Sequence, residues 1–131
     1  MTRFMLDTNA VSYALRGQGR VGTRIRSHAP SELCVSAITV AELRFGADKR
    51  GSVKLHALID DFFAEVSIES VGASAAARYG RLGAELAAAG TPIGQFDTLI
   101  AAHALSLGLV LVASNTKHFK QVTGLSVEDW F

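Results

Sequence analysis

The stretch Phe4-Met5-Leu6-Asp7-Thr8-Asn9 joins three apolar residues directly to a carboxylate, a hydroxyl and an amide. A short apolar run of this kind is typical of a strand that is buried on both faces, and Asp, Thr and Asn are residues that begin helices. The stretch therefore predicts that Asp7 lies where a central strand stops and a helix starts. In open parallel α/β sheets, ligands bind at this edge, outside the carboxyl ends of the strands.

The rest of the chain alternates short apolar runs with longer segments that have helical periodicity. Further strands are expected at 33–36, 67–71 and 109–113, with a last one near 125–127. Helices are expected at 8–15, 37–45, 52–66, 73–89 and from about residue 95, with Gly46 ending the second of them. Such alternation is typical of an α/β fold, here a three-layer α/β/α domain with a mostly parallel central sheet. The 131 residues contain no linker or repeat, so residues 1–131 are expected to form one domain.

Composition favours a cytoplasmic protein that has a protein partner. Apolar residues make up 49% of the chain, so we expect exposed apolar surface that a second subunit or another protein covers. No apolar run approaches the ~18 residues that span a bilayer, and the N-terminus lacks the apolar stretch of a signal peptide, so no membrane association is expected. The single Cys34 excludes an internal disulfide and a cysteine-based zinc site.

The charges are unevenly spread, although the net charge is only +1. Residues 1–54 carry nine Lys or Arg against four Asp or Glu, and residues 55–131 carry four against eight. This asymmetry is compatible with a basic face for a polyanion, but a solvated surface explains most charge runs equally well. The basic residues considered as phosphate contacts are Arg16, Arg44, Lys49, Arg50, Lys117 and Lys120.

Three acidic residues have simple structural explanations when each is taken alone. Asp7 can cap a helix, and Asp97 lies in a first helical turn, where a negative charge suits the helix dipole. Thr39 and Glu42 have the spacing of a capping box. For each acid alone, this structural explanation has at least even odds.

The same three acids together indicate metal chemistry. If the predicted strands are parallel neighbours, Asp7, Glu42 and Asp97 converge on one crevice, where crowded carboxylates repel unless a cation joins them. Oxygen ligands without His or Cys suit Mg²⁺ or Mn²⁺ rather than zinc. Such an ion activates a water molecule and stabilises the charge that develops on a phosphodiester.

Several segments of the chain occur in the order and spacing of a known family. These are Phe4 to Asn9, Val40 to Leu43, Pro92 to Ala104, Leu111 to Phe119 and the closing Val122 to Trp130. Together they closely resemble PIN-domain proteins of the VapC toxin type, and the resemblance covers the whole chain. It implies a PIN-like fold and a Mg²⁺- or Mn²⁺-dependent endoribonuclease, the toxin of a bacterial type II toxin-antitoxin system. It also implies a homodimer, an RNA substrate and a cognate VapB-type antitoxin.

The resemblance also implies roles for individual residues. Asp7, Glu42 and Asp97 match the family's catalytic acidic cluster, with Asp7 and Asp97 as direct metal ligands and Glu42 as a ligand through water or the residue that orients the attacking water. Thr8 and Asn115 are candidates to position ligands or the scissile phosphate, with capping and turn formation as an equally good explanation. Asn115 falls where many members have a further Asp, and an amide adds no charge for a second metal. Close relatives resemble nucleases that cut the initiator tRNA anticodon loop, so the implied substrate extends to tRNA.

Two other classes of function fit parts of the sequence. An Asp after the first strand also suits an aspartate-based phosphoryl-transfer domain, but such domains place two acids there, whereas Thr8 and Asn9 follow Asp7. A catalytically inactive PIN-like interaction module would keep the fold and lose cleavage, and the complete acidic trio argues against it.

Three further residues with chemically versatile side chains are expected to have structural roles. His103 lies on an apolar helix and is expected in the core or an interface, His118 in a polar loop, and Trp130 in packing.

Overall fold

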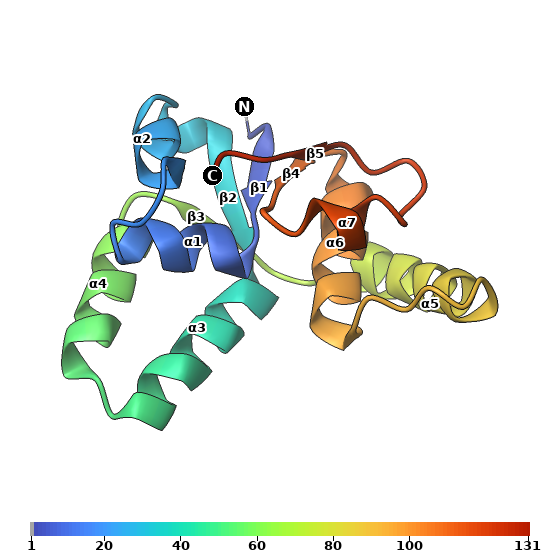
Figure 1. Cartoon of the computed structure of the whole chain (residues 1–131), viewed down its shortest axis with the longest axis horizontal. Helices are drawn as coiled ribbons and strands as arrows, with labels where there is room; N and C mark the ends of the chain where they lie inside the picture. The colour runs from blue at the N-terminus through green and yellow to red at the C-terminus, as the bar shows by residue number, and fades with distance from the viewer. Residues whose placement is uncertain (1) are drawn as a thin grey trace.

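Five strands form one sheet in the order β3-β2-β1-β4-β5, and every pair of neighbours is parallel. The structure is a computed structural model that describes residues 2–131 (Figure 1). The strands are β1 (Phe4–Leu6), β2 (Leu33–Ser36), β3 (Ser67–Glu69), β4 (Val110–Val112) and β5 (Val127–Glu128). The helices are α1 (Thr8–Leu15), α2 (Val21–Arg26), α3 (Ala37–Arg50), α4 (Val53–Phe63), α5 (Ala73–Ala88), α6 (Gln95–Leu107) and α7 (Thr116–Phe119), with a short 3-10 helix η1 (Pro30–Glu32).

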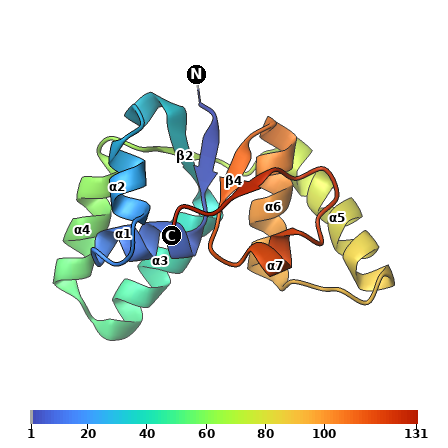
Figure 2. The same cartoon turned by 45° about the horizontal axis from the view of Figure 1, so that its top comes forward.

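Alternate residues of the central strand enter two separate apolar layers, because successive side chains of a strand point to opposite faces. Phe4 and Leu6 pack in a cluster with residues of α1, α2, α3 and α4, whereas Met5 packs with residues of α5 and α6. Figure 2 shows these two groups of helices on opposite sides of the sheet. The predicted three-layer α/β/α fold is confirmed. The predicted single domain of residues 1–131 includes residue 1, which lies outside the described residues, and its boundaries stay a prediction.

The carboxyl ends of the three central strands lie at the same level of the sheet. Leu6 is in register with Val35 of β2 and with Val112 of β4. The backbone N–H of Asp7 continues this ladder by donating to the Val112 carbonyl at 2.9 Å. The residue after β1 is therefore fixed at the edge where α1 and α3 begin.

The structure differs from the predicted elements at Gly46 and in two short helices. Gly46 does not end α3, which continues to Arg50 and stops at Gly51, where φ is +60°. A glycine inside a helix costs only about 1 kcal/mol relative to alanine, so the packing of α3 on the core overrides it. Helices α2 and α7 lie in segments where no helix was predicted. They have only six and four residues, too few to give a clear periodic signal.

Within residues 2–131, no helix combines the length and the apolar character needed to cross a bilayer.

Trp130 packs the C-terminal segment against the edge of the core. Its side chain is 2% exposed, its ring packs edge-on against Phe4 at 5.0 Å, and it stacks on His28 at 4.7 Å. The indole N–H donates to a carboxylate oxygen of Glu128 at 2.9 Å. The expectation that Trp130 packs is confirmed.

Replacing this tryptophan tests how much the C-terminal segment contributes to stability. Trp130→Ala should lower the free energy of unfolding by about 3 to 5 kcal/mol, because it removes a large buried side chain and leaves a cavity. Urea unfolding followed by circular dichroism measures the change without relying on tryptophan fluorescence. Leu107→Ala on the exposed side of α6 is the control and should cost less than about 1 kcal/mol. Equal losses in the two variants would contradict the packing role.

Candidate active site

Asp7 is the buried acid at the centre of the candidate site. It is the N-cap of α1, and its side chain accepts a hydrogen bond from the Ala10 backbone N–H at 2.7 Å. Only 4% of its surface is exposed. Burial raises the pKa of Asp7 to about 7, the Ala10 hydrogen bond opposes this rise, and the charges of Asp97 and Glu42 add to it. The structure thus brings the three acids into one region, where their charges act on one another.

Glu42 approaches the site from α3 and is held by a hydroxyl of α1. Thr8 Oγ1 donates to Glu42 Oε1 at 2.6 Å and lies 3.3 Å from the hydroxyl of Thr39. The predicted capping box of Thr39 and Glu42 is wrong, because Ser36 is the N-cap of α3 and accepts from the Ile38 N–H at 3.1 Å. Thr8 therefore orients an acid that is distant in the sequence, and the capping explanation for Glu42 no longer applies.

Asp97 lies in the first turn of α6, opposite a histidine that the sequence did not connect to the site. Burial raises the pKa of Asp97, and His118 beside it lowers that pKa. His118 Nδ1 lies 3.6 Å from Asp97 Oδ2 and 2.9 Å from the side-chain amide nitrogen of Asn115. Because both contacts involve Nδ1, this atom accepts from Asn115 when it is unprotonated and pairs with Asp97 when it is protonated.

His118 was expected in a polar loop, but it lies on α7. Asn115 contacts His118 rather than a carboxylate, and its side chain makes no capping hydrogen bond to α7. The spacing of Asn115 and His118, three residues apart directly after β4, is the sequence signal that could have suggested their contact.

His103 has the structural role that the sequence predicted, since it is almost fully buried. Its Nδ1 lies 2.8 Å from Ser36 Oγ, and burial lowers the pKa of the imidazole. The contact links α6 to the residue that caps α3. His103 therefore connects the two helices that carry Asp97 and Glu42.

The donor chemistry of the acids fits a hard divalent cation. Within residues 2–131, no group of three or more His, Cys, Asp or Glu side chains is arranged to hold a metal ion. Mg²⁺ is usually bound by one or two carboxylates and keeps several water molecules, so it does not need a complete protein cage. The pKa of about 7 on buried Asp7 indicates that its negative charge is costly without a nearby positive charge. A cation beside Asp7 would offset that cost.

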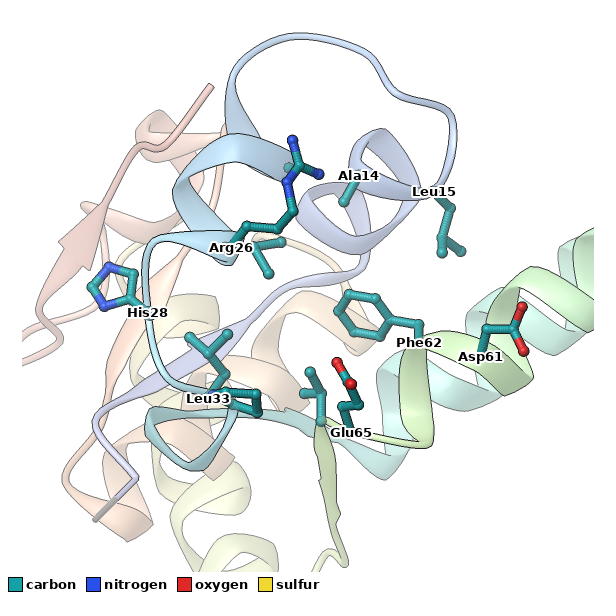
Figure 3. A pocket seen from close by; sticks show the side chains of 12 residues that line it. Ala14, Leu15, Arg26, His28, Leu33, Asp61, Phe62 and Glu65 are labelled. Atoms are coloured by element: carbon teal, nitrogen blue, oxygen red, sulfur yellow. The ribbon is translucent and has the colours of Figure 1, made fainter.

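Two cavities near α1 have different relations to the acids. A cavity of about 210 Å³ is bordered by Glu42 and Thr8 and has Arg16 and Arg50 in its wall. A second cavity of about 450 Å³ lies among α1, α2 and α4, with Arg26 and other side chains in its lining (Figure 3). None of the predicted site residues lines the second cavity. Only the smaller cavity is continuous with the acidic site.

The pKa of Asp7 predicts a pH-dependent cost to stability. Asp7 ionises near its ordinary pKa of 3.8 in the unfolded chain but only near 7 when folded, so its contribution to stability falls as the pH rises through that window. Asp7→Asn keeps a capping oxygen and cannot ionise. At about pH 8 without divalent metal, this variant should exceed the wild type in free energy of unfolding by roughly 1 to 4 kcal/mol, and the difference should vanish near pH 4.

Urea unfolding at the two pH values measures this difference. Asp61→Asn on α4 is the matched control, since Asp61 is exposed and is not one of the three site acids. An Asp7→Asn variant that is less stable than the wild type at both pH values would show that the buried carboxylate has no such cost.

Comparisons with known proteins identify the family of this chain. The sequence matches the PIN domain family over residues 4–125. It is 37% identical over 131 residues to the tRNA(fMet)-specific endonuclease VapC of Shigella flexneri, with 99% of each chain covered. It is 40% identical over 132 residues to ribonuclease VapC2 of Haemophilus influenzae, again with 99% of each chain covered. The crystal structure of DNA-bound VapBC from Salmonella typhimurium has the same fold, with a TM-score of 0.90, 36% identity and 100% of each chain covered. The resemblance found in the sequence is confirmed, and the chain belongs to the VapC family of PIN-domain ribonuclease toxins.

Proposed function

We propose that this chain is a divalent-metal-dependent endoribonuclease in which Asp7, Glu42 and Asp97 form the catalytic site. The observation that carries the proposal is the burial of Asp7 beside two other acids, at the strand edge where parallel α/β sheets bind ligands. A buried acid with a strongly shifted pKa in a cluster of like charges is typical of a functional site, because its ionised form is costly to the fold.

The residues around the acids hold them in place for this chemistry. Asp7 and Asp97 would hold Mg²⁺ or Mn²⁺ directly, and Glu42 directly or through water. When bound, the ion supplies the positive charge that stabilises a phosphodiester under attack and makes a water molecule more acidic. The Ala10 N–H fixes the Asp7 carboxylate, and the Thr8 hydroxyl fixes one oxygen of Glu42 and leaves its other oxygen for water or substrate.

His118 and Asn115 support the third acid from α7. Burial raises the pKa of Asp97, and His118 beside it opposes that rise, because a positive charge near a carboxylate favours its ionised form. When Nδ1 of His118 is unprotonated, the side-chain amide of Asn115 donates to it and orients the imidazole. In this arrangement Asn115 positions a site residue, and it holds no second metal ion.

Substrate and partner are proposed from the relatives. The Shigella flexneri relative is named for tRNA(fMet), and we extend this substrate, cut in the anticodon loop, to the present chain. Solved structures of similar chains are of VapBC assemblies from Salmonella typhimurium and Rickettsia felis, the latter with a TM-score of 0.90 and 32% identity. We therefore propose a VapB-type antitoxin as the partner, and a homodimer stays a prediction.

Charge removal at the acids tests the catalytic proposal. Asp7→Asn and Asp97→Asn should each slow the cleavage of initiator tRNA by about 100-fold or more, since each removes a metal ligand while it keeps the shape of the side chain. Chelation with EDTA should abolish cleavage by the wild type, and added Mg²⁺ or Mn²⁺ should restore it. Gel analysis of end-labelled tRNA measures the rate, with Asp61→Asn as the control expected to cut like the wild type.

Three outcomes would overturn the catalytic proposal. Wild-type rates in folded Asp7→Asn and Asp97→Asn would remove these acids from the chemistry. Binding of RNA without cleavage at any metal concentration would favour an inactive interaction module. Phosphate release from an acyl phosphate, without cleavage of RNA, would favour aspartate-based phosphoryl transfer.

A further inference from the structure

Two exposed aromatic rings lie beside the acidic site. Phe45 of α3 is 68% exposed and Phe96 of α6 is 51% exposed, although both are large apolar side chains. Phe96 directly precedes Asp97, and Phe45 follows Glu42 by one helical turn. The two rings, together with Ala41 and Glu42, line one cavity of about 370 Å³. Helix α3 therefore presents an aromatic ring near Glu42, and helix α6 presents one next to Asp97.

The opposite side of Glu42 has a different chemistry. The cavity of about 210 Å³ described above also borders Glu42, and Arg16 and Arg50 are among its lining residues. Neither arginine forms an ion pair with another residue in the part of the chain that the structure describes, residues 2–131. Glu42 thus separates an aromatic cavity from a basic one.

Basic side chains in one cavity and aromatic rings in the adjoining one are the two kinds of group that bind a single-stranded polynucleotide. Arginine side chains bind phosphates, and exposed aromatic rings stack on unpaired bases, which is the usual way in which proteins bind single-stranded RNA. In a duplex the bases remain in the helical stack and cannot reach such rings. Lys49 lies with its Nζ 5.9 Å from the centre of the Phe45 ring and adds positive charge on the same side. An apolar peptide would cover the rings but would leave both arginines without an anion.

We propose that Phe45 and Phe96 bind an unpaired base next to the scissile phosphate, while Arg16 and Arg50 bind a neighbouring phosphate on the other side of Glu42. The inference rests on the proposed ribonuclease function and deepens it, because it assigns the base contact and the phosphate contact to named residues beside the acids. The two phenylalanines bind substrate and take no part in proton transfer.

The experiment separates base binding from phosphate binding. The probes are fluorescein-labelled oligouridylate, which stays single-stranded, and an abasic ribose-phosphate chain of equal length. Fluorescence anisotropy gives the Kd of each probe in an Asp97→Asn background, which prevents cleavage. Phe45→Leu and Phe96→Leu should each weaken binding of oligouridylate by about 5- to 100-fold and leave binding of the abasic chain within about 2-fold.

Matched variants identify the stacking contact and the phosphate contact. Phe96→Tyr keeps an aromatic face and should bind oligouridylate like the parent. Arg50→Gln should weaken binding of both probes equally. It should also reduce the slope of log Kd against log salt concentration by the amount that corresponds to about one phosphate contact. Leu107→Ala, an exposed apolar residue at the far end of α6, should change neither affinity.

The abasic probe also distinguishes RNA from a second copy of the chain as the occupant. If the rings pack between copies, the leucine variants will weaken both probes equally while the mass measured by light scattering changes, and this result overturns the proposal. Unchanged affinity for oligouridylate overturns it as well.

Cleavage of tRNA by the otherwise wild-type chain reports separately on the proposed function. Efficient cleavage by Phe45→Leu and Phe96→Leu, with unchanged binding in the Asp97→Asn background, would contradict the proposed base site but not the proposed ribonuclease function. Base-dependent binding by a chain that cuts no RNA would support the proposed base site and contradict the proposed ribonuclease function.

Discussion

The burial of one carboxylate, that of Asp7, is the constraint on which the site depends. The residue is fixed twice by backbone hydrogen bonds, since its N–H donates to Val112 and its side chain accepts from Ala10. Burial raises the pKa of Asp7 to about 7, although the hydrogen bond from Ala10 opposes that rise. A buried ionised acid at this position costs the fold stability, and a neutral residue is expected to be more stable there. Such a conflict is expected where a residue serves chemistry rather than packing.

The three acids meet at one edge of the parallel sheet, but a different element positions each of them. Asp7 follows β1 directly, and Glu42 enters from α3, which begins at the end of β2. Asp97 follows no strand, and its position depends on how α6 packs across the sheet. The hydrogen bond between His103 and Ser36 supplies this alignment, because Ser36 also caps α3. One buried hydroxyl therefore fixes the two helices that carry Glu42 and Asp97 relative to each other.

The sequence could predict what depends on local patterns and not what depends on packing between distant segments. The apolar run before Asp7 and the nearly all-apolar α6 identified the central strand and an interior helix. Helix α7 was not predicted, because four residues carry no periodicity, and the contact of His118 with Asp97 was missed with it. The hydrogen bond from Thr8 to Glu42 spans 34 positions and forms only because α1 packs against α3. The capping-box spacing at Thr39 was misleading, since Ser36 had already begun that helix.

The supporting groups around the acids orient them without neutralising them. A backbone N–H holds Asp7 and a hydroxyl holds Glu42, and neither group carries a net charge. Among residues 2–131, no Lys or Arg forms an ion pair with any of the three acids, and Arg44 of α3 pairs instead with Asp60 of α4.

The remaining partner, His118, is half exposed, so water screens its interaction with Asp97. A lysine or arginine in the pocket would have stabilised the fold and occupied the place of a cation. A cation from solution would offset the negative charge of the acids, as the proposed metal-dependent function requires.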